Sequence, residues 1–384
     1  MIPLAVPNLT GNERCYLNDC IDTTFVSSVG PYVTRLEELV AQKTDSASAV
    51  ATSSGTTALH LALMGVGVSR DELVLVPSFT FIASVNAIAH CGASPWFVDI
   101  DPEDWTIDAW QLEKELESCT TRNNNGVWHK TLGRRVAAIM PVYTLGNVAD
   151  MDSINRVAEA YGLPVVADAA CAIGARYKNR GMGSLATLSI VSFNGNKTVT
   201  AGGGGSVFGN DETLVAHVKH VSTTGRILPD YDFDCVGYNY RMTNLQAAVG
   251  CAQMERLDSF LQKKREIREC YCREFADLDG VSFFPESNFG GSSCWFSGIV
   301  LQKGGIGRLH EIESRLRSRG VESRMFWKPA HLQPPYKSAP RAKSLDVSES
   351  LWDRVLTLPC STGLTEDEQK MVVSAVKDVI GEMK

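Results

Sequence analysis

The sequence predicts an α/β protein built on a mainly parallel sheet, and two observations support that class. Between about residues 46 and 193, short apolar runs alternate with longer amphipathic runs. Short apolar runs are typical of buried strands, and strands separated by crossover helices pair in parallel, with helices on both faces. After about residue 240 the pattern changes to long amphipathic runs with few strands, which predicts a smaller α+β domain. We therefore expect two domains, at 1–245 and 246–384.

The individual elements follow from the same patterns. The lead-in predicts a short helix at 13–22 and, after the Gly30-Pro31 turn, a helix at 32–42; we expect it to pack with the second domain. The polar segment 119–133 predicts a mobile surface loop. In the large domain we expect strands at 47–52, 73–76, 96–100, 136–142, 164–167 and 186–193, and helices at 57–66, 84–91 and 151–161. Farther on, we expect helices at 244–278, 307–319 and 366–383 and a strand at 294–301.

Composition excludes several classes of protein. The 384 residues carry a formal charge of -7, so the chain has no basic footprint for nucleic acid. No uninterrupted run of about 18 apolar residues predicts a membrane span, and the first residues lack the pattern of a secretory signal. We therefore expect a cytoplasmic protein.

Cysteine and histidine spacing gives no indication of a metal. The eleven cysteines form no C-x-x-C pair, and their odd number favours reduced thiols over disulfides. His217 and His220 lie three residues apart on an expected helix, but no third ligand candidate lies near them in the sequence. We interpret them as part of a surface helix face and expect no metal.

A single lysine, Lys197, follows the expected strand at 186–193 and precedes the four glycines 202–205. Partial burial on such a turn favours a neutral amine, the form that attacks a carbonyl to give a Schiff base. Glycines there would let the backbone pass close to the lysine. Taken alone, Lys197 is better explained as a solvated loop residue, so other sites must support a catalytic role.

Two further strand ends supply that support. The segment 53–57, Ser-Ser-Gly-Thr-Thr, follows one strand and opens a helix, which makes it a phosphate cradle or an ordinary N-cap. Asp168 ends an apolar strand and needs a partner, which a protonated pyridine nitrogen, a helix cap or a salt bridge would supply. With Ser192 and Lys197 at the third strand end, a cradle, a carboxylate and an amine lie on one sheet edge. That set predicts pyridoxal 5'-phosphate.

Other features of the sequence test this cofactor. An aromatic side chain should cover its ring, and Phe79 and Phe81 are both suitably placed, with core packing as the alternative for each. The residues before Lys197 do not match the Walker A pattern, and the glycines from 202 onward do not match G-x-G-x-x-G. Nucleotide hydrolysis and dinucleotide redox chemistry therefore lose support.

At these residues the chain resembles the DegT-type sugar-nucleotide aminotransferases, which are pyridoxal-phosphate enzymes of fold type I. The resemblance spans nearly the whole length, through motifs at 12–13, 26–30, 54–59, 77–81, 98–101, 141–146, 168–170, 192–197, 237–242 and 331–334. It implies a mainly parallel seven-stranded sheet flanked by helices, with a smaller C-terminal α+β domain. It also implies a homodimer with shared active sites and glutamate as amino donor.

The resemblance assigns roles to single residues. Lys197 is implied to be the Schiff-base lysine and proton carrier, Asp168 the partner of the pyridine nitrogen, and Phe81 the residue stacked on the ring. Phosphate contacts are implied for Gly55, Thr56 and Ser192, and for Asn239 toward the partner's cofactor. Cys171, Asn194 and Gly203 depart from the family, which usually has glutamine, often histidine, and glutamate at those positions. The first departure bears on tuning of the cofactor.

The motifs at 194–197 and 327–333 resemble members that aminate C4 of UDP-linked 4-keto-6-deoxy-N-acetylglucosamine in legionaminic acid and bacillosamine pathways. The nearest alternative is a perosamine synthase acting on a GDP-linked 4-keto-6-deoxy-mannose. We expect substrate contacts from Ser28, Asn194, Lys328 and His331. Ser28 could equally cap a helix, and Lys328 and His331 could stabilise the domain interface. The sequence also allows a regulatory homologue that binds the cofactor without turnover, or a pyridoxal enzyme acting on amino acids.

Overall fold

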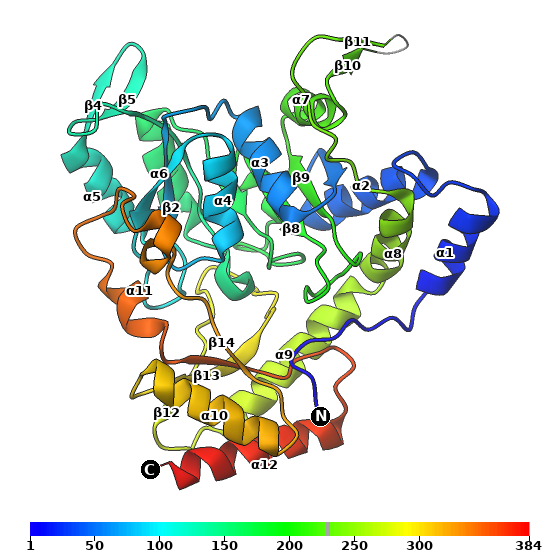
Figure 1. Cartoon of the computed structure of the whole chain (residues 1–384), viewed down its shortest axis with the longest axis vertical. Coiled ribbons are helices and arrows are strands. Elements are labelled where there is room, and N and C mark those ends of the chain that lie inside the picture. Colours follow the sequence, from blue (N-terminus) through cyan, green and yellow to red (C-terminus); the bar gives the residue numbers. More distant parts are fainter. Residues whose placement is uncertain (228–230, 384) are drawn as a thin grey trace.

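The computed structural model describes residues 1–227 and 231–383 and shows a large and a small part (Figure 1). Within the described residues, the large part is built on a sheet with strand order β3-β2-β6-β7-β8-β9-β1. Isolated parallel bridges, Ile139 to Val165 and Val142 to Asp168, join β6 to β7. β9 runs antiparallel to both of its neighbours, and the other strands run parallel. The strands are β1 (Ser48–Thr52), β2 (Leu73–Pro77), β3 (Ser94–Val98), β6 (Arg135–Ile139), β7 (Val166–Asp168), β8 (Leu188–Ser192) and β9 (Gly205–Gly209).

Helices cover both faces of this sheet, as its apolar strands require. Alternate strand residues point to opposite faces, so Leu73 and Leu75 belong to one hydrophobic cluster and Val74 and Val76 to the other. The first face is covered by α2 (Pro31–Thr44), α5 (Ala109–Cys119), α6 (Met151–Tyr161) and α8 (Asn244–Met254). The second face is covered by α3 (Gly55–Gly65), α4 (Ile82–His90) and α7 (Glu212–Ser222). The predicted α/β class and mainly parallel seven-stranded sheet are confirmed.

The small part is an antiparallel sheet with helices. Its strand order is β12-β13-β15-β14, with β12 (Val281–Phe283), β13 (Ser297–Leu301), β14 (Arg324–Met325) and β15 (Val355–Leu358). The helices α10 (Ile306–Ser318) and α12 (Glu366–Glu382) pack on it, and α11 (Asp346–Leu351) lies between the two parts. Only the first residues of the lead-in pack with this part: the Ile2 amide donates to Gly320 O at 2.7 Å, and Ile2 and Leu4 belong to its hydrophobic cluster. The two helices of the lead-in pack with the large part.

The long helix α9 (Leu257–Glu274) runs diagonally from the large part to the small part (Figure 1). Leu257 and Phe260 pack in the large core, whereas Ile267 and Tyr271 pack in the small one. The division at 245/246 stays a prediction.

Two predicted elements were wrong in detail, and one strand of the large sheet was missed. The expected helix 244–278 is two helices, α8 and α9, separated at 255–256. The expected loop 119–133 includes the end of α5 and a hairpin of β4 (Thr120–Asn123) and β5 (Gly126–His129) that pairs with β6. Its polar residues were misleading because the hairpin projects from the sheet edge (Figure 1). β9 was missed because its strand begins at the last of four glycines.

The remaining elements lie at the surface. The predicted helix α1 (Glu13–Asp22) is confirmed and packs against α8. After α7, a small hairpin of β10 (Arg226–Ile227) and β11 (Asp232–Phe233) projects from the large part (Figure 1). Among the helices that the structure describes, none is both long and apolar enough to cross a lipid bilayer.

Candidate active site

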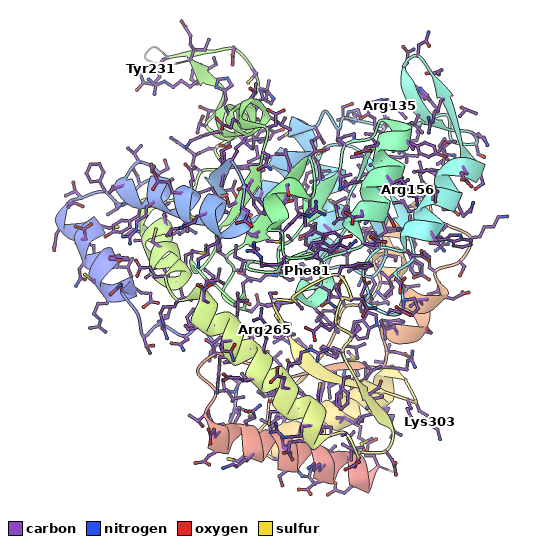
Figure 2. The ribbon with its side chains drawn as sticks, turned by 180° about the vertical axis from the view of Figure 1, so that it is seen from behind. Phe81, Arg135, Arg156, Tyr231, Arg265 and Lys303 are labelled. Atoms are coloured by element: carbon purple, nitrogen blue, oxygen red, sulfur yellow. The ribbon has the colours of Figure 1, made fainter. Side chains whose placement is uncertain are left out.

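A cavity of about 430 Å³ lies where the carboxyl ends of the parallel strands face the small part. Ligands of open parallel sheets bind at this edge, because the strand ends and the following loops meet there. Phe81, which lines the cavity, lies between the two parts (Figure 2). The cavity brings together eight of the residues expected to bind cofactor or substrate, and Gly203 lines it as well. The eight are Gly55, Thr56, Phe81, Asp168, Cys171, Ser192, Asn194 and Lys197.

The start of α3 forms one wall of the cavity. Ser54 caps the helix, because its Oγ accepts the Thr57 amide at 3.1 Å while the Ser54 amide donates to Thr57 Oγ1 at 3.0 Å. The cap and the cradle are therefore compatible, since capping uses Ser54 and Thr57 while Gly55 and Thr56 line the cavity. An anion there would face the first-turn N–H groups and the positive end of the helix dipole.

Close backbone packing holds this wall in place. A Cβ on Gly55 would lie 2.8 Å from Ser192 Cβ, so β8 and α3 approach too closely for a larger residue. A Cβ on Gly205 would lie 2.8 Å from the Gly55 amide nitrogen, and Gly204 has φ +106° beside Met242. The close approaches of Gly205 and Gly204 are thus to the start of α3 and to Met242, which precedes α8. The expectation that the glycines relieve crowding at the lysine and cofactor stays a prediction, and Gly203 and Gly204 line the same cavity as Lys197.

Asp168 ends β7 inside the cavity and is 5% exposed. Ser84 Oγ donates to its Oδ2 at 2.6 Å, and the Ala170 amide donates to its Oδ1 at 3.1 Å. Burial raises the pKa of Asp168, while Ser84, the Ala170 amide and the Lys197 charge lower it. None of the ion pairs among the described residues includes Asp168. A protonated ring nitrogen would supply the charge partner that a buried carboxylate requires.

Lys197 lies on the turn after β8, and its amide donates to Asn194 O at 3.0 Å. Its Nζ donates to Cys171 Sγ at 3.1 Å and lies 4.0 Å from the centroid of the Trp295 ring. Trp295 Nε1 in turn donates to Asn196 O at 2.8 Å, so the small part holds the lysine turn. Burial raises the pKa of the Cys171 thiol. The amine is therefore placed inside the cavity next to a neutral thiol.

Sequence reasoning missed an aromatic wall formed by Trp295, Phe326 and Trp327, all of which line the cavity. Trp327 stacks on Phe326 with ring centroids 4.3 Å apart and lies 6.1 Å from Phe81. These residues come from segments more than 90 positions after Lys197, and apart from the motif that begins at Trp327 their sequence signal is the local density of aromatic residues. Phe81 is the phenylalanine at the cavity, since Phe79 is fully buried in the core.

Four expected residues do not line the cavity. His331 is 1% exposed, and its two ring nitrogens lie 2.5 Å from Ser78 Oγ and 2.9 Å from Glu349 Oε1. This geometry favours the interface alternative for His331. Lys328 is exposed, with its Nζ 5.4 Å from the Trp352 ring centroid. Ser28, before α2, and the exposed Asn239 also lie outside it. Their substrate and partner contacts stay predictions.

The residues present fit one cofactor. The seven-stranded sheet, the anion cradle, the buried carboxylate and the lysine amine at its carboxyl edge define a pyridoxal-phosphate-dependent enzyme of fold type I. The chain belongs to the DegT/DnrJ/EryC1/StrS aminotransferase family, whose sequence model matches residues 7–377.

Individual relatives match over nearly the whole chain. A GDP-perosamine synthase of Caulobacter vibrioides is 37% identical over 382 residues, covering 99% of this chain and 98% of the relative. A GDP-perosamine synthase of Vibrio cholerae is 35% identical, covering 98% of this chain and 99% of the relative. A Streptococcus pneumoniae protein described as a sugar aminotransferase, solved in its pyridoxal-phosphate form, is 25% identical with a TM-score of 0.89. That match covers 100% of this chain and 99% of the other.

Proposed function

We propose that this enzyme transfers an amino group from glutamate to C4 of a nucleotide-linked 4-keto-6-deoxy sugar. The observation that carries the proposal is the convergence of Lys197, Asp168 and the Gly55-Thr56 cradle on one cavity. Two relatives named GDP-perosamine synthase match nearly the whole chain, which supports a GDP-linked sugar as the first candidate. The UDP-linked 2-acetamido sugar expected from the motifs has no such support and is the second candidate.

Each wall of the cavity has a distinct task. Gly55, Thr56 and Ser192 bind the cofactor phosphate, and Asp168 keeps the ring nitrogen protonated. When bound, pyridoxal phosphate supplies the electron sink and carries the amino group between the two substrates. Lys197 Nζ anchors the cofactor and then moves a proton to and from the reacting carbon.

The small part completes the site. The aromatic wall excludes water and orients the lysine through the contact of Trp295 with its turn. Arg324 lines the cavity with a side chain that is 68% exposed, which leaves its guanidinium accessible to an incoming diphosphate. Asn194 is exposed at the same opening and is the predicted substrate contact best placed to reach the sugar.

A homodimer with shared active sites is part of the proposal. Asn239 is exposed and lies outside its own cavity, as a residue serving a partner would. Co-expression of Lys197→Ala and Asn239→Ala chains tests this. If sites are shared, mixed dimers regain one intact site and exceed the activity of either parent. Additive activities of the separate parents would reject it.

Substrate and lysine are tested together. The enzyme is incubated with glutamate and GDP-, UDP- or dTDP-linked 4-keto-6-deoxy sugars, and each product is read by mass. Borohydride reduction followed by peptide mapping locates the residue that carries the cofactor. We expect attachment at Lys197 and a loss of roughly 10²–10⁴-fold or more in turnover for Lys197→Ala, with no loss for the exposed control Lys337→Ala.

Each outcome points to a different function. Cofactor attached at Lys197 without amination of any sugar would favour the regulatory homologue. If only 2-oxo acids, the keto forms of amino acids, were aminated with glutamate, the enzyme would act on amino acids and not on sugars. Attachment at another lysine would overturn the site itself.

A further inference from the structure

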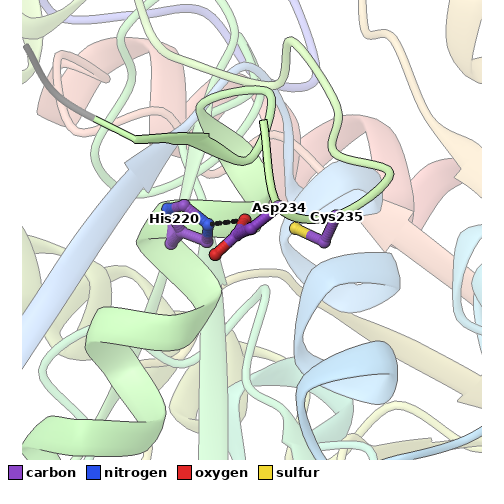
Figure 3. A group of neighbouring side chains, drawn as sticks. All are labelled: His220, Asp234 and Cys235. Atoms are coloured by element: carbon purple, nitrogen blue, oxygen red, sulfur yellow. Dashed lines mark hydrogen bonds and ion pairs between the residues drawn. The ribbon is translucent and has the colours of Figure 1, made fainter. Parts of the chain in front are cut away.

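Three potential metal ligands gather outside the active site, at the end of α7. His220 lies in its last turn, and the chain returns from the β10–β11 hairpin to place Asp234 and Cys235 beside it (Figure 3). One ligand atom from each lies within 4.8 Å of the others, and His220 Nε2 is 2.6 Å from Asp234 Oδ1. The sequence offered no third ligand near His220 because these two residues follow 14 and 15 positions later.

Backbone contacts fix the positions of these ligands. The Gly225 amide donates to His220 O at 3.0 Å, and the Asp234 amide donates to Gly225 O at 3.2 Å. Gly225 has φ +66°, and a Cβ there would lie 2.6 Å from Cys235 Sγ, so the thiol packs directly against this turn. Farther along, the Tyr238 amide donates to Val221 O at 2.8 Å. Backbone hydrogen bonds thus join the end of α7, the turn at Gly225 and the segment 234–238, and they fix the three side chains relative to one another.

The ligand chemistry suits a borderline-soft transition metal. Imidazole, carboxylate and thiolate are the donors that Zn²⁺ takes, at about 2.0–2.3 Å in a tetrahedron. Such bonds place a nitrogen and an oxygen ligand roughly 3.3 Å apart, so the His220–Asp234 pair, now 2.6 Å apart, would open by about 0.7 Å. His220 is partly exposed and the other two residues are exposed, which leaves a fourth position for water.

We propose that His220, Asp234 and Cys235 form a binding site for a zinc-class divalent metal ion with water as the fourth ligand. The ion would join α7 to the strand segment that leaves the hairpin. That segment continues to Tyr240, whose carbonyl accepts the Ser53 amide at 2.8 Å beside the cradle, and it carries Asn239 on the way. The metal would therefore fix the start of the segment 234–240 to α7, while the end of that segment is hydrogen-bonded to Ser53 beside the active site.

The test uses the full-length protein with its cofactor, stripped of metal by a chelator and then dialysed. Zn²⁺ is titrated in competition with a chromophoric chelator, and Co²⁺ is added separately to read thiolate-to-cobalt absorption. We expect one ion per chain, and Cys235→Ser, Asp234→Asn and His220→Asn should each weaken binding by at least the roughly 10- to 100-fold that loss of an outer-shell partner costs. His217→Asn, on the exposed face of the same helix, and Cys15→Ser, another exposed thiol, should bind as the parent does.

A second measurement reports whether the metal stabilises the backbone contacts between α7 and the segment 234–238. Amide hydrogen exchange at Gly225, Asp234 and Tyr238 should slow when Zn²⁺ is added to the parent and not when it is added to Cys235→Ser. Because the replaced side chains are exposed or partly exposed, the variants are expected to fold, which thermal unfolding checks. Absence of stoichiometric binding, or binding that survives all three substitutions, would overturn the proposal and leave a hydrogen-bonded surface cluster.

Discussion

The contact between Gly55 and Ser192 gives a prediction whose size follows from the structure. Gly55→Ala places a Cβ 2.8 Å from Ser192 Cβ and 3.0 Å from Ser192 Oγ, and the next contact is at 3.5 Å. Real Cβ atoms do not approach so closely, so β8 and α3 must separate. Overpacking of this kind costs about 1–3 kcal/mol of folding stability. Ser192→Gly removes both clashing atoms and leaves only the ordinary contact.

A double-mutant cycle measures this effect. Denaturant unfolding of the cofactor-free protein is compared for Gly55→Ala, Ser192→Gly and the pair. We expect the pair to be more stable than the sum of the single changes by about 1–3 kcal/mol, because the strain is absent in the double variant. Gly195→Ala, with no atom within 4 Å of the added Cβ, is the control and should be nearly neutral. Additive single changes would refute the argument that close packing requires glycine at the cradle.

Three further predictions concern buried polar groups. Burial raises the pKa of Asp104 to about 6, so ionisation of Asp104 destabilises the fold as the pH rises between about 4 and 6. The Asp104→Asn variant keeps an acceptor oxygen for Thr106 and cannot ionise. The free energy of unfolding of this variant relative to the parent should increase by up to about 3 kcal/mol from pH 4 to pH 7, and a difference that does not change with pH would contradict this. His331→Ala should cost about 1–3 kcal/mol in denaturant unfolding by leaving Ser78 unpaired, with little change in KM; a large rise in KM with unchanged stability would instead support substrate contact. Asp168→Asn should bind the cofactor with its ring nitrogen neutral, which lowers kcat by roughly 100-fold or more and alters the cofactor absorbance, and an unchanged spectrum would argue against the pairing.

Prediction from the sequence was most accurate where a local pattern was sufficient. The strands β2 and β8 are short apolar runs, and the helix α6 has apolar residues on one face, so periodicity located all three. The hairpin at 120–129 has no such pattern, because β4 is polar and mostly exposed and β5 is only four residues long. The strand β9 was not predicted either, because a run of glycines usually indicates a turn. Here Gly205 belongs to the strand because a larger residue would clash with the start of α3.

The same difference separates the parts of the active site. Lys197, Asp168 and the Gly55-Thr56 cradle each follow a strand, and parallel strands must end at one edge of the sheet. Sequence alone was therefore enough to place them together and to predict the cofactor. The aromatic wall comes from the small part, and its distance from Lys197 depends on how two separately formed cores pack together.

What the sequence by itself determined was the class of the enzyme: the α/β alternation, the order of the strand ends and the cofactor that their residues suit. Only the tertiary structure decided which phenylalanine meets the cavity, that His331 lies buried at an interface, and that Asp234 and Cys235 join His220. The physical reason is that periodicity records which side of an element is buried. It does not record which distant side chain packs against that side, because long-range contacts form only when the whole chain folds.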